Sequence, residues 1–256
     1  MSYVDAHIHL ADAGYAGKVD QVITEATQHN VAHMLTNATD FESSLETIKL
    51  AKQFPQRVLA AIGVHPSTVV QSEDLHLTEF GEMIEENAEW VTAVGEIGLD
   101  GKYSQDERIK ERQREVFRFF LKLAEEKNLP VVVHSRQAVQ ETFDTLAEFH
   151  IPRVLLHWYE GPIENLDAIK ERGFFISIGP ALLYSRRIEA IARTADAKTI
   201  LSETDGPVFY RGLFHGQLTQ PWFVVEVIQR LAEFKNLSTD QLRSMIFANF
   251  LNFIHP

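Results

Sequence analysis

Short, nearly continuous apolar runs alternate with longer amphipathic stretches along the whole chain. The runs are rich in β-branched residues, as expected for parallel strands that are buried on both faces. The eight strand candidates cover residues 3–9, 32–37, 58–64, 91–97, 130–134, 153–157, 174–178 and 199–203. Strands that alternate with helices in this way predict the α/β class and a single (β/α)8 TIM barrel.

Helical patterns fill the intervals between these runs. The clearest covers residues 106–127, where apolar residues recur at helical spacing before the stop signal at 128–130. Two further helices are expected at the end of the chain. The last should begin at Ser238, which can cap it together with Gln241 three residues later.

The chain has 256 residues, and the usual size of such a barrel is roughly 250 residues. We find no Ser/Gly linker, charge block or low-complexity segment that would mark a domain boundary. We therefore expect one domain over residues 1–256. The longest irregular stretch, 205–220, should be a functional loop, because loops of this length are uncommon unless they form lids or binding surfaces.

Composition limits where the protein works and what it can bind. No apolar run approaches the roughly 20 residues needed to cross a bilayer, and the start of the chain lacks the features of a secretory signal. We expect a soluble, cytoplasmic protein that does not enter a membrane. The net charge of -12 opposes a broad grip on duplex nucleic acid, but a local phosphate pocket is compatible with it, because bound divalent cations reverse the local field.

The chain contains no cysteine. Any metal must therefore be held by imidazole and carboxylate groups. Side chains of this kind stand at the ends of the predicted strands: His7, His9, Glu96, His134, His157 and Asp205. Barrel enzymes place their chemistry at the C-terminal ends of the strands, so the fold would bring all six together.

Each of these residues also has a simpler interpretation. The His-x-His pattern is common, Glu96 could form a salt bridge or cap a helix, and Asp205 could cap a helix. On a strand, His7 and His9 point to the same side, and Asp5 would lie beneath them as an orienting carboxylate. Asp100 could instead form a hydrogen bond within the turn that follows Glu96.

The joint pattern favours a metal centre with two divalent ions, for which zinc, manganese and magnesium all remain candidates. Two such ions can activate a shared water and stabilise the leaving oxygen. The predicted reaction is hydrolysis.

Several segments together resemble the TatD family of metal-dependent deoxyribonucleases, which belongs to the amidohydrolase-like barrels. The matching segments are Asp5-Ala6-His7-Ile8-His9-Leu10, Gly63-Val64-His65-Pro66, Gly95-Glu96-Ile97-Gly98-Leu99-Asp100, residues 130–136, His157 with Gly161, and Glu203-Thr204-Asp205. The match runs almost end to end.

The resemblance implies a role for each site residue. His7, His9 and Asp205 would hold one metal ion, His134 and His157 the other, and Glu96 would bridge them; Asp205 would also orient or deprotonate the attacking water. His65 and Arg136 would bind the scissile phosphate, and DNA or another phosphodiester would be the substrate.

The chain departs from the family pattern around the substrate side. Tyrosine often follows the Gly-Leu-Asp segment in the family, whereas Gly101 and Lys102 stand before Tyr103 here. Tyr159 stands where phenylalanine is common, and Gly206 replaces the serine that usually follows Asp205. Trp158, next to a predicted ligand, is the best candidate for a wall of the substrate pocket.

Two other functions compete with a nuclease. The same metal shell permits attack on a carbon centre, as in an ester, a lactone, an amide or an aminoacyl ester of tRNA. A metal-stabilised scaffold without turnover would also keep the shell, since fold does not establish chemistry. The sequence leaves the oligomeric state open.

Overall fold

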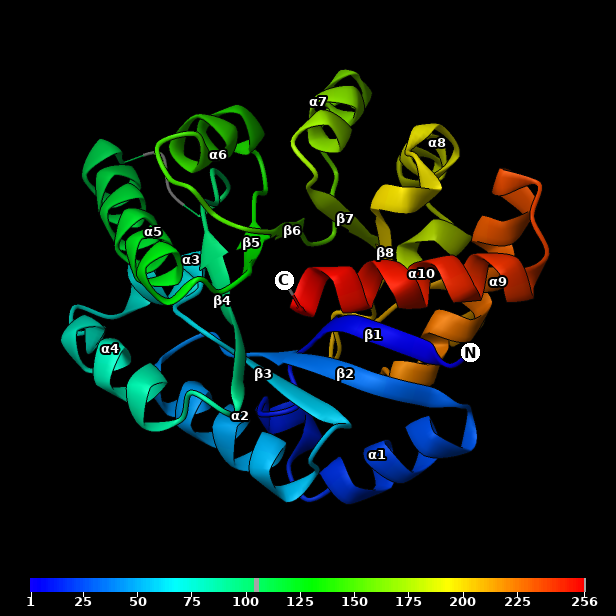
Figure 1. Ribbon diagram of the computed structural model, residues 1–256, viewed down its shortest axis with the longest axis horizontal. Coiled ribbons are helices and arrows are strands. Elements are labelled where there is room, and N and C mark those ends of the chain that lie inside the picture. The colour runs from blue at the N-terminus through cyan, green and yellow to red at the C-terminus, as the bar shows by residue number, and fades with distance from the viewer. Residues whose placement is uncertain (104–105, 256) are drawn as a thin grey trace.

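The eight strands lie side by side in chain order, each parallel to its neighbour, in the computed structural model (Figure 1). The structure describes residues 1–103 and 106–255. The strands are β1 (Tyr3–Ile8), β2 (Val31–Asn37), β3 (Val58–Ile62), β4 (Val91–Gly98), β5 (Val131–His134), β6 (Val154–Leu156), β7 (Phe175–Ile178) and β8 (Ile200–Ser202). The segment around β8 returns to β1, where the Asp205 N–H donates to the His7 carbonyl at 2.8 Å. The predicted (β/α)8 barrel is confirmed.

Helices surround this ring of strands. The α-helices are α1 (Val19–Gln28), α2 (Phe41–Gln53), α3 (Pro66–Gln71), α4 (Leu77–Glu86), α5 (Glu107–Lys127), α6 (Val139–Leu146), α7 (Leu166–Glu171), α8 (Arg186–Thr194), α9 (Val224–Lys235) and α10 (Thr239–Ile254). Short 3-10 helices are η1 (Ala13–Tyr15), η2 (Ile163–Asn165), η3 (Pro180–Leu183), η4 (Ala197–Thr199), η5 (Gly212–Phe214) and η6 (Pro221–Phe223). The predicted helix over 106–127 is α5, and Asp106 caps it by accepting the Arg108 N–H at 2.9 Å.

Burial explains why the strands read as continuous apolar runs. All six residues of β1 and all four residues of β7 are buried. In β5, Val131, Val132 and Val133 are fully buried, although successive side chains point to opposite faces. One face therefore fills the barrel interior and the other packs against the helices, so neither face needs polar residues.

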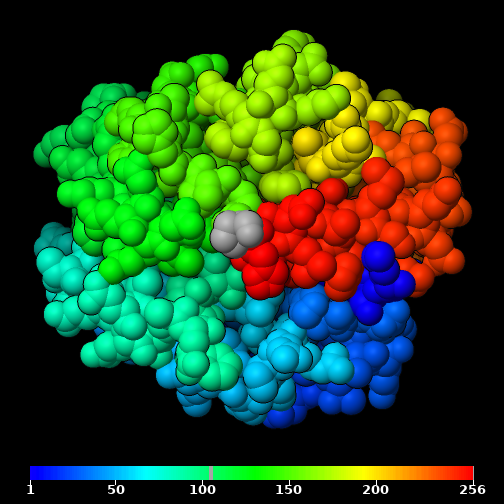
Figure 2. All heavy atoms as spheres, viewed as in Figure 1, coloured from blue at the N-terminus to red at the C-terminus, as the bar shows by residue number. Residues whose placement is uncertain are grey.

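Helix α10 covers the N-terminal end of the barrel. It runs across the middle of the view in Figure 1, and its atoms, coloured red, occupy the central part of the same face in Figure 2. The predicted capping box is present at its start, where the Gln241 N–H donates to the Ser238 hydroxyl at 3.2 Å. Further along, the Asn249 side chain donates to the carbonyls of Ala197 and Ile200 at 2.8 and 2.9 Å. The C-terminal strand ends lie at the opposite end of the barrel, away from α10.

The loop after β8 packs closely on the start of the chain. The Tyr15 hydroxyl donates to the Thr219 carbonyl at 2.8 Å, and a Cβ added to Gly206 would lie only 2.0 Å from the Tyr15 oxygen. A serine at position 206 would thus clash with Tyr15, which explains why this chain has glycine there. The Gly206 carbonyl also accepts the His9 N–H at 2.8 Å, which ties the loop to the end of β1.

In the described part of the chain, no helix is both long enough and apolar enough to cross a membrane. The expected cytoplasmic location stays a prediction.

The Asn249 bonds give a stability prediction. Asn249→Ala should lower the free energy of unfolding by about 1–3 kcal/mol, because two carbonyls next to β8 lose their donor in a buried place. Urea denaturation followed by circular dichroism measures this. Asn252→Ala, at an exposed position of the same helix, is the matched control and should change stability by less than about 0.5 kcal/mol. Equal effects of the two substitutions would contradict the bracing role of Asn249.

Candidate metal centre

The six side chains predicted as metal ligands meet at the C-terminal end of the barrel. Glu96 lies among them on β4, with only 2% of its surface exposed. Its two carboxylate oxygens face different sets of partners. Oε2 lies 3.4 Å from the Nε2 atoms of His7 and His9, and Oε1 lies 2.7 Å from His157 Nε2. The carboxylate thus stands between two groups of potential ligands.

The first group contains His7 Nε2, His9 Nε2, Glu96 Oε2 and Asp205 Oδ1. The two imidazole nitrogens are 3.1 Å apart, and Asp205 Oδ1 lies 3.3 Å from the first and 3.2 Å from the second. Four ligands at about 2.0–2.1 Å around a tetrahedral zinc ion would be about 3.3 Å from one another. The spacing therefore fits a divalent cation.

The second group contains Glu96 Oε1, His134 Nδ1 and His157 Nε2. His134 Nδ1 is 2.8 Å from Glu96 Oε1 and 3.1 Å from His157 Nε2. His65 Nε2 lies beside them, 3.3 Å from both Glu96 Oε1 and His134 Nδ1. These atoms could hold a second cation. His65, which was predicted to bind the scissile phosphate, thus lies directly beside the cluster.

Two of the imidazoles are oriented by acceptors on their outer nitrogens. His9 Nδ1 lies 2.8 Å from the Asn37 carbonyl, and His134 Nε2 lies 2.7 Å from Asp100 Oδ2. Each acceptor fixes the proton on the outer nitrogen and leaves the lone pair of the inner nitrogen toward the cluster. This is the tautomer that a metal ligand needs.

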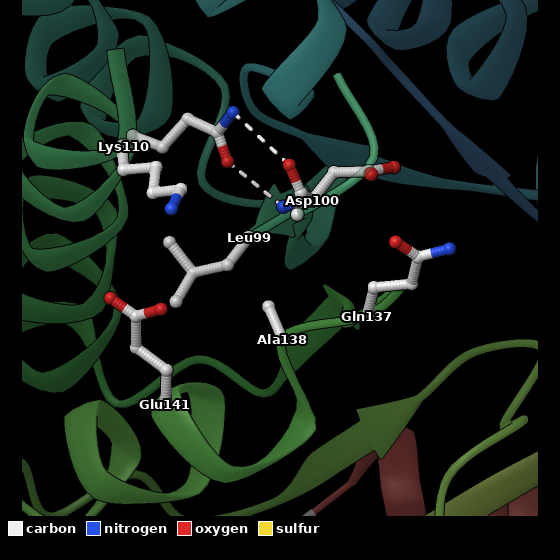
Figure 3. A pocket seen from close by; sticks show the side chains of 8 residues that line it. Leu99, Asp100, Lys110, Gln137, Ala138 and Glu141 are labelled. Carbon is white, nitrogen blue, oxygen red and sulfur yellow. Dashed lines mark hydrogen bonds between the residues drawn. The ribbon is translucent and has the colours of Figure 1, made fainter. Parts of the chain in front are cut away.

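Asp100 does more than the turn bond expected of it. Its carboxylate accepts the Lys102 N–H at 2.8 Å, as expected, and also holds His134 and Arg136. Its backbone is bound in turn by Gln113 of α5, which accepts the Asp100 N–H at 2.8 Å and donates to the Asp100 carbonyl at 3.4 Å, as the dashed lines in Figure 3 show. Gln113 thereby acts as a positioning residue for Asp100.

The expectation that Asp5 orients the two histidines of β1 is wrong. The Asp5 carboxylate accepts the backbone N–H groups of His7 and Thr204 at 3.3 and 2.9 Å, and also the Thr204 hydroxyl. Asp5 lies two residues before His7 on β1, level with the end of β8. Its side chain therefore joins the backbones of these two strands. Its burial raises the pKa of its carboxyl.

Glu203 is a site residue that was not predicted. It is fully buried, and its Oε2 accepts the Ser177 hydroxyl at 2.5 Å and lies 3.7 Å from His157 Nδ1. Among the described residues, Glu203 Oε1, His157 Nδ1 and His7 Nδ1 have no hydrogen-bond partner. A third cation between these three atoms would require His7 and His157 each to bind metal ions through both ring nitrogens. We therefore interpret the Glu203 carboxylate as the group that faces the outer nitrogens of these two rings.

The charges of the cluster are coupled. Burial alone would raise the pKa of Glu96, but the positive charge of His157 and the hydrogen bond from His134 hold it well below its usual value. Burial alone would lower the pKa of His9, but its hydrogen bond to Asp205 and the charge of Glu96 raise it to about 9. Without metal, Glu96 and Asp205 are thus ionised and His9 retains its proton, and divalent cations would replace this positive charge.

Arg136 lies beside the cluster, and part of its guanidinium is already bound by Asp100. Its Nε and Nη2 atoms lie 2.8 and 2.7 Å from Asp100 Oδ2, and its guanidinium lies 4.9 Å from the centre of the Tyr103 ring. Asp100 leaves the Nη1–Nη2 edge of the guanidinium, toward which an anion could make a bidentate contact. Arg112, a cation on α5, donates to the carbonyls of Val69 and Glu73.

A cavity of about 730 Å³ opens beside the cluster. His134, His157 and Asp205 line it, together with apolar and charged side chains. The apolar ones are Trp158, Pro162 and Val208, the cationic ones are Lys102, Arg136 and Arg187, and Glu160 adds a carboxylate. Trp158 is therefore a wall of this cavity, as expected. Tyr159 is fully buried, and its hydroxyl donates to the Pro162 carbonyl at 2.8 Å.

An eight-stranded parallel barrel with its chemistry at the C-terminal strand ends is typical of barrel enzymes, and imidazoles and carboxylates there suit metal-assisted hydrolysis. The family model described as TatD related DNase matches residues 4–255. The chain therefore belongs to the TatD family, and the resemblance seen in its motifs is confirmed.

Individual relatives agree with this assignment. The uncharacterized metal-dependent hydrolase MJ1582 of Methanocaldococcus jannaschii is 31% identical over 253 residues, which cover 99% of this chain and 97% of that protein. The human deoxyribonuclease TATDN3 is 28% identical, over 97% of this chain and 93% of its own. The crystal structure of YjjV, the TatD homolog from Escherichia coli K12, has a TM-score of 0.91 at 26% identity and covers 99% of this chain and 98% of its own. The chain is accordingly a metal-dependent hydrolase.

The charge coupling gives a prediction for the metal-free protein. Asp205→Asn should lower the pKa of His9 from about 9 by about 1–3, because the neutral amide no longer stabilises the protonated ring. Titration of ¹⁵N-labelled histidines by NMR measures this. Asp144→Asn, at an exposed position, is the control. A His9 pKa that is the same in both variants would show that Asp205 does not hold this proton.

Proposed function

We propose that this hydrolase cleaves phosphodiester bonds in DNA with two divalent cations, and that residues 1–256 act as one catalytic domain. The observation that carries the proposal is the position of Glu96. Each of its oxygens faces a separate group of ligand atoms, and the two groups lie side by side at the edge of a cavity with cationic walls. Two adjacent cations and a cationic cavity suit an anionic ester.

Each ion would be held by a distinct set of residues. His7, His9 and Asp205 would hold one with Glu96 Oε2, and His134 and His157 the other with Glu96 Oε1. When bound, the ions would supply Lewis acidity and lower the pKa of a bound water. A donor set rich in imidazole suits zinc or manganese better than magnesium, which prefers oxygen ligands.

The protein side chains would bind the substrate and move the proton. Asp205 is ionised, because hydrogen bonds from His7 and His9 lower its pKa against the effect of burial, so it can accept a proton from the attacking water. The Nη1–Nη2 edge of Arg136 would bind phosphoryl oxygens while Asp100 holds the edge that carries Nε. His65, beside the second group, would donate a hydrogen bond to the same phosphate.

The cavity would accommodate a nucleotide next to the scissile phosphate. Trp158 offers a flat apolar surface and stacks on Tyr210, with ring centres 5.8 Å apart, and stacking on such a surface stabilises a bound base by about 1–3 kcal/mol. Arg187, on α8, lines the cavity too and donates one N–H to the Glu160 carbonyl; its remaining N–H groups would bind the phosphate on the far side of that nucleotide.

The decisive experiment is hydrolysis of end-labelled single-stranded DNA by metal-stripped protein reloaded with zinc, manganese or magnesium. We expect Glu96→Ala to lose bound metal and to lower the rate by at least about 100-fold, because both groups lose a shared ligand. Elemental analysis measures the metal, and Glu42→Ala, at an exposed position, is the control.

Two results would overturn the proposal in different ways. Near-normal turnover by the Glu96→Ala variant would reject the bridging role of this carboxylate. Absence of DNA cleavage with both groups loaded would instead favour a hydrolase of carbon centres, to be tested with esters and lactones.

Arg187→Gln tests the cavity separately. We expect it to raise the KM for an oligonucleotide about 10-fold, because one charge-assisted hydrogen bond to phosphate is lost, and to leave hydrolysis of bis(4-nitrophenyl) phosphate unchanged, because this diester has no flanking phosphate. Arg186→Gln, at the preceding exposed position, is the matched control. Similar oligonucleotide kinetics for the two variants would exclude Arg187 from the binding site.

A further inference from the structure

The histidines around Glu96 differ in what their outer nitrogens contact. His65 occupies the place of a fourth ligand in the second group, with Nε2 3.3 Å from both Glu96 Oε1 and His134 Nδ1. Distance alone would therefore make it one more metal-binding imidazole. The hydrogen bonds on the far side of the ring point to a different role.

A neutral imidazole carries one proton, so one nitrogen donates and the other accepts. In His9 and His134 the outer nitrogen faces an oxygen that can only accept, the Asn37 carbonyl at 2.8 Å and the Asp100 carboxylate at 2.7 Å. The inner nitrogen of each ring is left with its lone pair, as metal binding requires.

The outer nitrogen of His65 faces a donor instead. The backbone N–H of Ser67 donates to His65 Nδ1 at 3.1 Å, because His65 caps the start of α3. The Ser67 hydroxyl lies 2.6 Å from the same nitrogen and can rotate to donate as well. A backbone N–H cannot accept, so Nδ1 holds the lone pair and the proton is on Nε2. The cluster therefore faces an N–H group.

Neighbouring elements hold α3 in this position. The His65 N–H and the Thr68 hydroxyl both donate to the Thr39 carbonyl, at 2.9 and 2.8 Å. Arg112 of α5 donates to the Val69 carbonyl at 2.9 Å. Pro66 starts the helix with a fixed backbone angle. These contacts keep the Ser67 N–H directed at the imidazole.

We propose that Ser67 sets the tautomer of His65 and thereby makes His65 a hydrogen-bond donor to a substrate oxygen and not a fourth ligand of the second cation. The second group then has three protein ligands and an open position, the arrangement of a catalytic rather than a structural metal site. The identity of the oxygen as a phosphoryl oxygen rests on the proposed function, whereas the tautomer and the ligand count do not.

The tautomer is directly measurable by ¹⁵N NMR on histidine-labelled, zinc-loaded protein. We expect His65 to show an unprotonated Nδ1 and a protonated Nε2, and His9 and His134 to show a protonated outer nitrogen and a zinc-shifted inner one. A zinc-shifted Nε2 or a protonated Nδ1 on His65 would overturn the proposal. This measurement needs no substrate, so it stands even if DNA is not hydrolysed.

Zinc affinity and kinetics of position-65 variants provide the second test. His65→Ala and His65→Gln should each keep two zinc ions per chain, whereas His134→Ala should bind the second ion at least about 10-fold more weakly. His65→Ala should lower kcat/KM for DNA by about 100-fold, as for other lost donors to a developing charge. His65→Gln should recover part of this loss, because its amide can donate.

The variants separate the two roles of His65. Loss of the second zinc ion in both position-65 variants would show that His65 is a ligand and would overturn the proposal. A His65→Gln variant as slow as His65→Ala, with zinc retained in both, would reject the donor role. Ser67→Ala keeps the backbone N–H and should therefore keep the His65 tautomer; a changed tautomer would show that the backbone donor does not set it.

Discussion

The site depends on one buried carboxylate. Glu96 carries a negative charge at a place where only 2% of its surface is exposed, and a buried charge is tolerated only when partners compensate for it. The partners are imidazoles from β1, the β3–α3 connection, β5 and the end of β6, which lie far apart in sequence. Only a closed ring of parallel strands presents these segments to one point. The buried charge of Glu96 therefore depends on the barrel, which brings its partners together.

The hydrogen bonds that orient the cluster residues from outside are as important as the cluster itself. Asp100 Oδ2 accepts from both His134 and Arg136, so one oxygen orients a candidate metal ligand and a candidate substrate contact together. Gln113 fixes the Asp100 backbone from α5. Asp100 and Gln113 therefore link the position of α5 to both the candidate metal ligand and the candidate anion contact.

The barrel and most of the centre could be predicted from the sequence, because each depends on a local pattern. Val131, Val132 and Val133 read as a strand buried on both faces, and His134 directly follows them. The outer contacts depend instead on strand register and ring rotation. Asp5 was assigned to the wrong partners, because nothing in the sequence shows that it is level with Thr204. Asp100 and His134 are 34 residues apart, and Glu203 resembled any other acid near the end of a strand.

The acidic composition does not oppose an anionic substrate. The net charge of -12 belongs to the whole chain, and beyond about 10 Å salt screens most of that field from the site. Near the cavity the balance differs, because three cationic side chains line it, Lys102, Arg136 and Arg187, against the two carboxylates of Glu160 and Asp205. Divalent cations held by the two groups of ligand atoms would add further positive charge at the bottom of the cavity. The field that a substrate phosphate meets is therefore determined by a few side chains and ions within a Debye length.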